Sequence, residues 1–449
     1  MLRQAELIGA LSYALDITEG QPEGHCVRCC WIGMHIGRAI GLDERSLWDL
    51  YYTLLLKDLG CSSNAARICE LYMTDDLSFK RDFKLVDGSF PDIVRFALGH
   101  TGAGAPPLRR LRLLVDSLKS AEEAAQELVT TRCERGASIA RRLRFGEAVA
   151  RGIHSLDEWW NGKGRPDHLA GEAIPIHARI ALLSQVVDVF HADKGPSAAL
   201  AEARGRSGSW FDPRLVAALE RVGQSDDFWR VLGSPNIAET VFAQEPAQYA
   251  LTVDDEYLDE IAVAFGEVVD SKSPFTAGHS SRVALYAEHL AAQLGVPPAR
   301  RRWLRRGALL HDVGKLGVSN AILDKPGKLD GDEWDAVRAH ARFTEEILER
   351  IPQFAELARI AGGHHERLDG TGYPHGLQGD AIALETRIIT TADIFDAISA
   401  ERPYRGATSI PRTLEIMSES VGAAIDAECF AALQRTVEQL ERSPQQAAG

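Results

Sequence analysis

The sequence predicts an all-α protein built from two tandem helical bundles of the same kind. Apolar residues recur at the spacing of amphipathic helices, and no run of alternating β-branched residues indicates a strand. In addition, two segments of the first half reappear in the second half in the same order. We expect one domain at residues 1–225, a connector at 226–255 and a second domain at 256–449.

Helical periodicity is clearest where the second domain begins. Residues 254–270 carry a stripe of apolar side chains spaced as on one helix face, and residues 279–294 carry another. Gly295 and Pro297 then predict the end of the second helix, because glycine and proline commonly follow helix C-termini.

An internal repeat supports the two-domain organisation. Residues 158–190 match residues 366–398 at a constant offset of 208, with 11 identities in 33 positions. Residues 24–60 match residues 278–314 at an offset of 254. Because the offsets differ by 46, the first copy has about that many extra residues between its two windows. Two matched blocks in one order indicate a duplicated domain.

Charge and hydropathy exclude several classes of partner. The formal net charge of −14 argues against a nucleic-acid polymer or an anionic membrane as a partner, since both need a basic surface. No stretch approaches the 18 apolar residues of a transmembrane helix. The N-terminus lacks the pattern of a signal peptide, so we expect a cytoplasmic protein.

The seven cysteines are expected to be reduced and structural. Six of them lie within the first 133 residues. Cys26, Cys29 and Cys30, next to His25, could bind zinc. No second CxxC pair follows to complete such a site, so buried inert thiols are the better interpretation.

Histidine and aspartate residues gather in the second copy, in four predicted helical segments. His311, His364 and Asp393 align with apolar helix faces, where a polar group costs free energy unless a partner satisfies it. One such histidine is usually a hydrogen-bonded core residue, but a set of this size favours a shared metal centre. The candidate metal ligands are His279, His311, Asp312, His340, His364, His365 and Asp393.

The motif HDVGK, followed some fifty residues later by HHERLDGTGYP, resembles the signature of the HD-GYP phosphodiesterases over residues 257–433. The resemblance implies a helical bundle around two metal ions, usually iron or manganese. One ion would be held by His279, His311, Asp312 and Asp393, and the other by His340, His364 and His365, with Asp312 bridging. Some relatives bind a third ion through a glutamate at the position of Phe275, so we expect two ions here.

The chemistry implied is hydrolysis of a phosphodiester. Two metal ions lower the pKa of a bound water enough for it to attack at neutral pH. We assign catalysis to Asp312 and Lys315, with the ammonium of Lys315 placed beside the phosphate. Arg402 and Arg405, in the ERPYR segment, match the phosphate-binding basic pair of the family. Tyr373 either lines the pocket or packs beside it.

The first copy retains the helical pattern of the second copy but not its candidate metal ligands. His25 and Asp58 remain, whereas Lys57 replaces the counterpart of His311, and Cys61 that of Lys315. The remaining positions are occupied by Cys133 for His340, Leu156 and Asp157 for the His-His pair, and Gln185 for Asp393. We expect no metal there. Lys57 and Asp58 either pair inside the protein or both face solvent.

Three functions are weighed. The first is a phosphodiesterase for a cyclic dinucleotide second messenger, with cyclic di-GMP as the first choice and 3'3'-cyclic GMP–AMP as the alternative. The second is another HD-type phosphohydrolase acting on mononucleotides or alarmones, which the GYP extension disfavours. The third is a non-catalytic adaptor that binds a nucleotide or a cyclase, which the complete ligand set disfavours. The sequence leaves a homodimer open.

Overall fold

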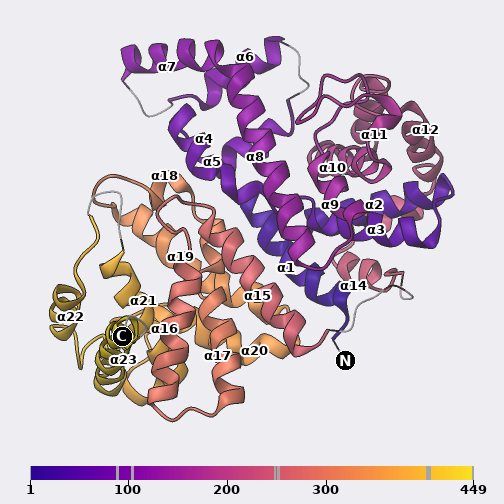
Figure 1. Cartoon of the computed structure of the whole chain (residues 1–449). Coiled ribbons are helices and arrows are strands. Elements are labelled where there is room, and N and C mark those ends of the chain that lie inside the picture. The colour runs from indigo at the N-terminus through magenta and orange to yellow at the C-terminus, as the bar shows by residue number, and fades with distance from the viewer. Residues whose placement is uncertain are drawn as a thin grey trace. The chain divides into compact units, whose positions relative to one another are not determined.

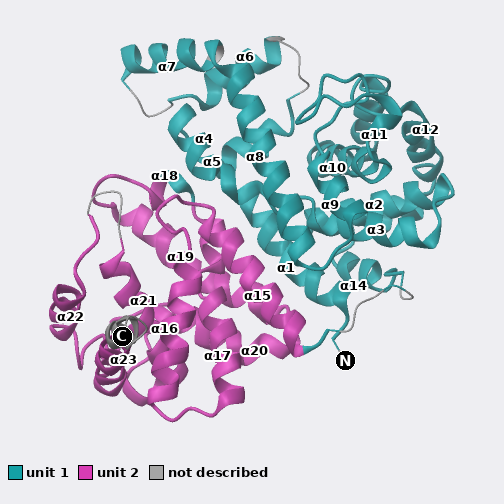
Figure 2. Ribbon diagram, in the orientation of Figure 1, with its two compact units in different colours: residues 1–254, 319–321 teal, residues 255–318, 322–449 magenta. Residues whose placement is uncertain are grey.

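The computed structural model describes residues 2–86, 90–102, 106–246, 249, 253–400 and 406–446. Within these ranges the regular structure is helical, with isolated β-bridges in place of strands. The predicted all-α fold class is therefore confirmed. The chain divides into two compact units (Figure 2). Unit 1 comprises residues 1–254 and 319–321, and unit 2 comprises residues 255–318 and 322–449.

Four helices form the centre of unit 1 and lie side by side (Figure 1): α2 (His25–Ala39), α3 (Glu44–Leu56), α9 (Glu147–His154) and α10 (Ile176–Lys194). The other helices of this unit are α1 (Gln4–Thr18), α4 (Ala65–Tyr72), α5 (Asp76–Phe83), α6 (Phe90–His100), α7 (Pro107–Lys119), α8 (Ala121–Arg142), α11 (Pro196–Gly205), α12 (Pro213–Val222), α13 (Asp226–Leu232) and α14 (Ile237–Phe242).

Unit 2 has the same central arrangement, made by α16 (His279–Gln293), α17 (Pro298–Leu310), α20 (Ala355–Gly362) and α21 (Leu384–Ser399). Around it are α15 (Asp255–Asp270), α19 (Gly331–Glu349), α22 (Ile410–Ser418) and α23 (Ala427–Gln446). The short helix α18 (Asn320–Leu323) is divided, with its first two residues in unit 1 and its last two in unit 2. Short 3₁₀ helices η4 (Val313–Gly317) and η6 (Gly363–His365) follow α17 and α20.

The duplication is visible in the helix boundaries. The helices α2 and α16 cover the same positions at the offset of 254, and α9 and α20 coincide at the offset of 208. Both units also use a buried glutamate to fix the loop after the third central helix. Glu158 accepts hydrogen bonds from the Asp167 and Leu169 amides, and Glu366 accepts the equivalent pair from His375 and Leu377. The two predicted helical bundles are thus versions of one fold.

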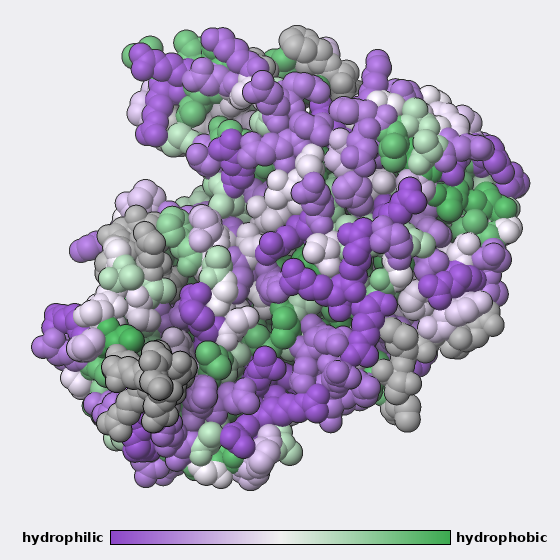
Figure 3. All heavy atoms as spheres, viewed as in Figure 1, coloured by the Kyte–Doolittle hydropathy of each residue, from purple (hydrophilic) through white to green (hydrophobic). Residues whose placement is uncertain are grey.

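The extra residues of the first copy form helices α4 to α7. Apolar side chains remain exposed on α6 and α7, with Leu98 at 52%, Leu108 at 80% and Leu111 at 58% exposure. The viewed surface is mainly hydrophilic, with hydrophobic residues scattered over it, including over α6 and α7 (Figure 3).

The segment predicted as a connector, residues 226–255, includes the helices α13 and α14, which belong to unit 1. The Trp31 indole donates a hydrogen bond to the Phe228 carbonyl at 3.2 Å, and the Tyr51 hydroxyl donates to the Val241 carbonyl at 3.2 Å. These anchors explain why a polar, proline-containing segment is still partly helical. Among the described residues, no helix has the length and apolar character needed to cross a membrane.

Candidate metal centre

Five elements of unit 2, or their ends, place the predicted ligands around one point. His279 begins α16, His311 and Asp312 follow α17, and His340 lies on α19. The adjacent His364 and His365 end η6, and Asp393 lies on α21. All seven candidates are therefore brought together. Most are almost fully buried, as expected for groups that satisfy one another or a shared ion.

Asp312 lies between the two halves of this cluster. Its Oδ2 is 3.5 Å from His279 Nε2 and 3.3 Å from His311 Nε2. Its Oδ1 is 3.5 Å from His340 Nε2 and 3.6 Å from His364 Nε2. The two carboxylate oxygens thus face different pairs of histidines, which is the arrangement that a bridging ligand requires. Asp393 Oδ1 adds a second carboxylate 3.3 Å from His279 Nε2.

Hydrogen bonds fix the tautomers of the histidines. In His311, His340 and His364 the Nδ1 atom contacts the backbone carbonyl three residues earlier. Because a carbonyl oxygen can only accept, each Nδ1 carries the proton and each Nε2 presents a lone pair to the centre. The Nε2 atoms of His340 and His364 are only 3.4 Å apart, so two lone pairs face each other.

The inward-facing atoms fit a metal centre. His311 Nε2 and Asp312 Oδ1 are buried and have no hydrogen-bond partner. Buried acceptors that face other acceptors cost free energy, and positive charge between them removes this cost. Imidazole nitrogen combined with carboxylate oxygen is a donor set that suits first-row transition metals. The residues present therefore fit the ions that the HD-GYP resemblance implies.

Electrostatics place several of these groups, but not His279, in the protonation states of metal ligands. Burial, with the charge of neighbouring groups, lowers the pKa of His340 to about 4 and that of His365 to about 3. Burial alone would raise the pKa of Asp312, but the charges of Lys315 and His311 bring it well below its usual value. Neutral imidazoles and an ionised carboxylate are the forms that bind metal, so His340, His365 and Asp312 are already in the binding form. Burial alone would lower the pKa of His279, but hydrogen bonds to Asp312 and Asp393 raise it well above its usual value, so His279 must release a proton when metal binds.

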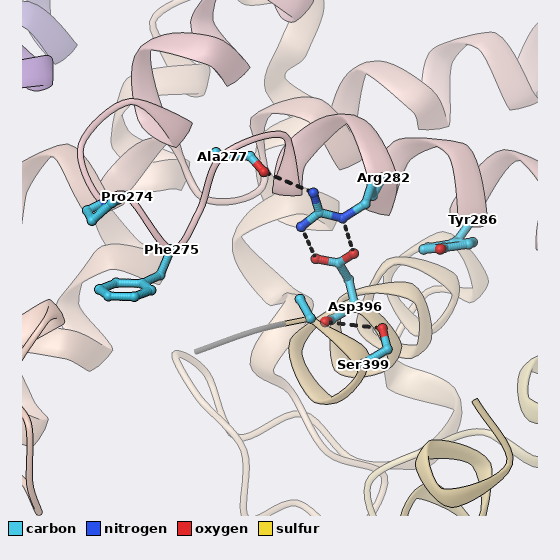
Figure 4. A pocket seen from close by; sticks show the side chains of 8 residues that line it. Pro274, Phe275, Ala277, Arg282, Tyr286, Asp396 and Ser399 are labelled. Atoms are coloured by element: carbon cyan, nitrogen blue, oxygen red, sulfur yellow. Dashed lines mark hydrogen bonds and ion pairs between the residues drawn. The ribbon is translucent and has the colours of Figure 1, made fainter. Parts of the chain in front are cut away.

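Two residues that sequence reasoning missed hold His279 in place. His279 Nδ1 lies 2.7 Å from Asp396 Oδ2, so the ring keeps Nε2 toward the centre. Arg282 donates hydrogen bonds to both oxygens of Asp396, at 2.6 and 3.0 Å. Both residues line an open pocket that Phe275 also lines (Figure 4). The signal was present in the sequence, because Arg282 and Asp396 are both identical in the first copy, as Arg28 and Asp188.

Some of the other predicted site residues lie at the edge of the ligand cluster, and the rest lie outside the described residues. Lys315 Nζ is 2.5 Å from Asp312 Oδ2, and its side chain is 24% exposed. The Tyr373 ring lies 4.8 Å from the His365 ring, so Tyr373 does flank the ligand cluster. Arg402 and Arg405 lie outside the described residues.

In unit 1 a lysine ammonium lies at the position that corresponds to the centre of the ligand cluster in unit 2. Lys57 Nζ is fully buried, hydrogen-bonds to Asp58, and lies 3.1 Å from both His25 Nε2 and Gln185 Oε1. These three partners stand where Asp312, His279 and Asp393 stand in unit 2. Of the two alternatives left open by the sequence, internal pairing of Lys57 and Asp58 is the one found.

The position of a second cationic side chain in unit 1 shows that one assignment made from the sequence was wrong. The counterpart of His340 is Arg132 and not Cys133. A Cβ on Gly314 would lie 1.9 Å from the His340 carbonyl, and a Cβ on Gly60 would lie 1.9 Å from the Arg132 carbonyl. The extra residues of the first copy thus end before Arg132, so the offset of 208 already applies there. Arg132 pairs with Asp157, the counterpart of His365.

Comparisons with known proteins agree with this arrangement. The family model of the HD domain matches residues 112–215 in unit 1 and residues 264–429 in unit 2. The 3'3'-cGAMP-specific phosphodiesterase 3 of Vibrio cholerae serotype O1 is 58% identical over 96% of this chain and 94% of its own. A crystal structure of a cyclic GMP-AMP specific phosphodiesterase of V. cholerae covers 97% of this chain and 98% of its own. It has 52% identity and a TM-score of 0.66.

More distant similarity is confined to part of the chain. The cyclic di-GMP phosphodiesterase response regulator RpfG of Xanthomonas campestris pv. campestris is 40% identical over 37% of this chain and 45% of its own. The similarity that extends over both units is therefore to proteins named for the hybrid dinucleotide.

Proposed function

This chain belongs to the HD-domain family, and to its HD-GYP cyclic-dinucleotide phosphodiesterases, and on that premise we propose that unit 2 hydrolyses 3'3'-cyclic GMP–AMP with bound metal ions. The observation that carries the catalytic part is the placement of Asp312, whose two oxygens face separate histidine pairs. The complete ligand set in this unit disfavours a non-catalytic adaptor.

The substrate choice rests on the extent of the similarity. The sequence alone favoured cyclic di-GMP, with cyclic GMP–AMP as the alternative. A relative that matches 96% of this chain is named for 3'3'-cGAMP, whereas RpfG, named for cyclic di-GMP, matches 37%. The alternative is therefore the better supported substrate, and we adopt it.

The residues of unit 2 have separate roles in metal binding and in catalysis. His279, His311, Asp312 and Asp393 would hold one ion, and His340, His364 and His365 the other, with Asp312 shared. When bound, the ions supply Lewis-acid activation of water and neutralise charge on the phosphate. The carbonyl partners of the Nδ1 atoms keep His311, His340 and His364 in one tautomer and orientation. The partly exposed ammonium of Lys315 stabilises negative charge that develops on the phosphate oxygens.

We predict a preference for the hybrid dinucleotide in a direct assay. Purified, metal-supplemented protein should hydrolyse 3'3'-cyclic GMP–AMP with a kcat/KM on the order of tenfold or more above that for cyclic di-GMP, a difference of about 1.4 kcal/mol. Initial rates measured by chromatography for both substrates and cyclic di-AMP test this. Equal or faster hydrolysis of cyclic di-GMP would reverse the substrate assignment without affecting the enzyme class.

Metal content provides a second prediction. Anaerobically purified protein should contain about two transition-metal ions per chain, all in unit 2. Elemental analysis of the Asp312→Ala protein checks the location, because unit 1 has Lys57 and Arg132 where positive charge is needed. Two ions retained in that variant would place the metal elsewhere, whereas one ion or none is expected, because of the two proposed ligand groups only that of His340, His364 and His365 remains complete.

The basic pair of the ERPYR segment gives a third prediction. Changing Arg402 or Arg405 to alanine should raise KM and have little effect on metal content. These side chains are expected to bind the phosphate of the substrate and not the metal ions. Loss of a charge-assisted hydrogen bond should cost on the order of 1.5–3 kcal/mol in kcat/KM. Steady-state kinetics with parallel metal analysis provides the measurement. Unchanged kinetics in both variants would remove the pair from the site.

A further inference from the structure

Unit 1 contains a cavity of about 380 Å³ beside the buried Lys57. The polar residues that line it include the counterparts of the catalytic side chains. Cys61, Arg132, Asp157, Arg165 and Gln185 occupy the positions of Lys315, His340, His365, Tyr373 and Asp393. The cavity is therefore at the place where unit 2 has its reaction centre, although the ligands for metal are gone.

The extra helices of the first copy close this space with apolar and aromatic walls. Phe79 of α5 and Phe96 of α6 line it, with their rings 4.8 Å apart. Trp159 and Trp210 also line the cavity, and they stack on each other with their ring centroids 4.2 Å apart. Aromatic side chains can bind planar rings by stacking or by edge-to-face contact. The walls therefore favour a planar aromatic ligand.

The polar groups of the lining are nearly balanced in charge. Lys84 Nζ lies 2.8 Å from Glu19 Oε2, and Arg165 donates to Glu122 at 2.5 Å. Arg132 pairs with Asp157, and Lys80, the remaining cation, pairs with Asp76. A polyanion would have to approach these carboxylates, so the site suits an uncharged molecule with both donors and acceptors. Arg165 Nε is buried without a hydrogen-bond partner and offers one donor.

We propose that unit 1 binds a purine nucleoside in this cavity. Its base has a flat aromatic face for the aromatic walls, and its ring edge carries the donors and acceptors that the mixed lining can pair. The volume lies near the low end of ordinary small-molecule sites, which span roughly 300–1,000 Å³, and so suits one nucleoside better than a cyclic dinucleotide. The inference does not depend on which substrate unit 2 hydrolyses.

The test is calorimetric titration of the full-length protein with guanosine and with adenosine. We expect one of them to bind with a stoichiometry near one per chain. Ala125 lines the cavity, so Ala125→Phe should fill it and weaken binding about tenfold or more. Ala201→Phe, at an exposed position on α11, is the matched control and should leave binding unchanged. Arg165→Met removes the spare donor without adding bulk, so it should weaken binding even if the phenylalanine variant fails to fold.

Three outcomes would overturn the proposal. The first is absence of heat of binding for both nucleosides up to millimolar concentration. The second is equal affinity of wild type, Ala125→Phe and Arg165→Met, which would put the nucleoside in unit 2. The third is saturation of the cavity by decanoate, an apolar probe whose binding Ala125→Phe abolishes, with neither nucleoside competing; this would assign the cavity to an acyl chain.

Discussion

Asp312→Asn is expected to lower kcat by a factor on the order of 10³ or more while the protein stays folded. A metal centre contributes several kcal/mol to a hydrolytic transition state, and about 1.4 kcal/mol corresponds to a factor of ten in rate. Asp312 is the residue whose two oxygens face both histidine pairs. The amide keeps its volume but provides one oxygen and no charge. The loss should therefore fall on both ions at once.

The measurement combines single-turnover kinetics with elemental analysis and circular dichroism. Asp332→Asn makes the same chemical change at an exposed carboxylate on α19 and should keep wild-type turnover. The double variant with His311→Ala should be hardly slower than Asp312→Asn alone, because residues of one centre act as a unit. Wild-type kcat in metal-supplemented Asp312→Asn protein would mean that hydrolysis occurs at another site.

The helices could be predicted because their signal is local. Periodic apolar residues placed a helix at 254–270, where α15 spans Asp255–Asp270. Glycine and proline placed the end of α16 correctly as well, since Gly295 has a positive φ of 76° that other residues rarely adopt. The helices α13 and α14 were not predicted, because their segment is short and polar. The side chains that anchor this segment are about 190 residues away along the chain.

The ligand cluster could be predicted because each of its residues is costly to bury without the others. The roles of Asp396 and Arg282 were not predicted, since the contact between them spans 114 residues and leaves no local pattern. Their identity in both copies was the available sign. In both units an aspartate paired with an arginine contacts Nδ1 of the first histidine, His25 or His279, whether the adjacent centre is the candidate metal cluster or the Lys57 ammonium.

Comparison of the two units indicates how the same fold can accommodate either a candidate metal centre or side-chain cations. Each half of the cluster needs positive charge among buried acceptors. In unit 1 Lys57 meets that need beside Asp58, and Arg132 meets it beside Asp157. Burial alone would lower the pKa of Lys57, but the charge of Asp58 raises it well above its usual value, so the ammonium stays protonated. Positive charge is thus retained at both places, but without coordination chemistry.

Lys57→Met is accordingly expected to destabilise unit 1 by about 3–5 kcal/mol, the range for removal of one partner from a buried ion pair. Methionine fills a similar volume but leaves the Asp58 carboxylate, which has no solvent exposure, without its hydrogen-bonded cation. His25 Nε2 and Gln185 Oε1 lose the same donor. Urea unfolding monitored by tryptophan fluorescence and circular dichroism should show an earlier transition for unit 1, fitted separately from unit 2.

The double variant Lys57→Met with Asp58→Asn separates charge from packing. If the cost comes from a buried unpaired carboxylate, a neutral amide should recover most of the lost stability, since both members of the pair are then uncharged. If the cost comes from packing, the double variant should be no more stable than the single one. A single variant that loses less than about 1 kcal/mol would show that Lys57 does not replace a metal ion energetically. The recovery expected in the double variant therefore identifies the ammonium as the charge that compensates for the lost centre.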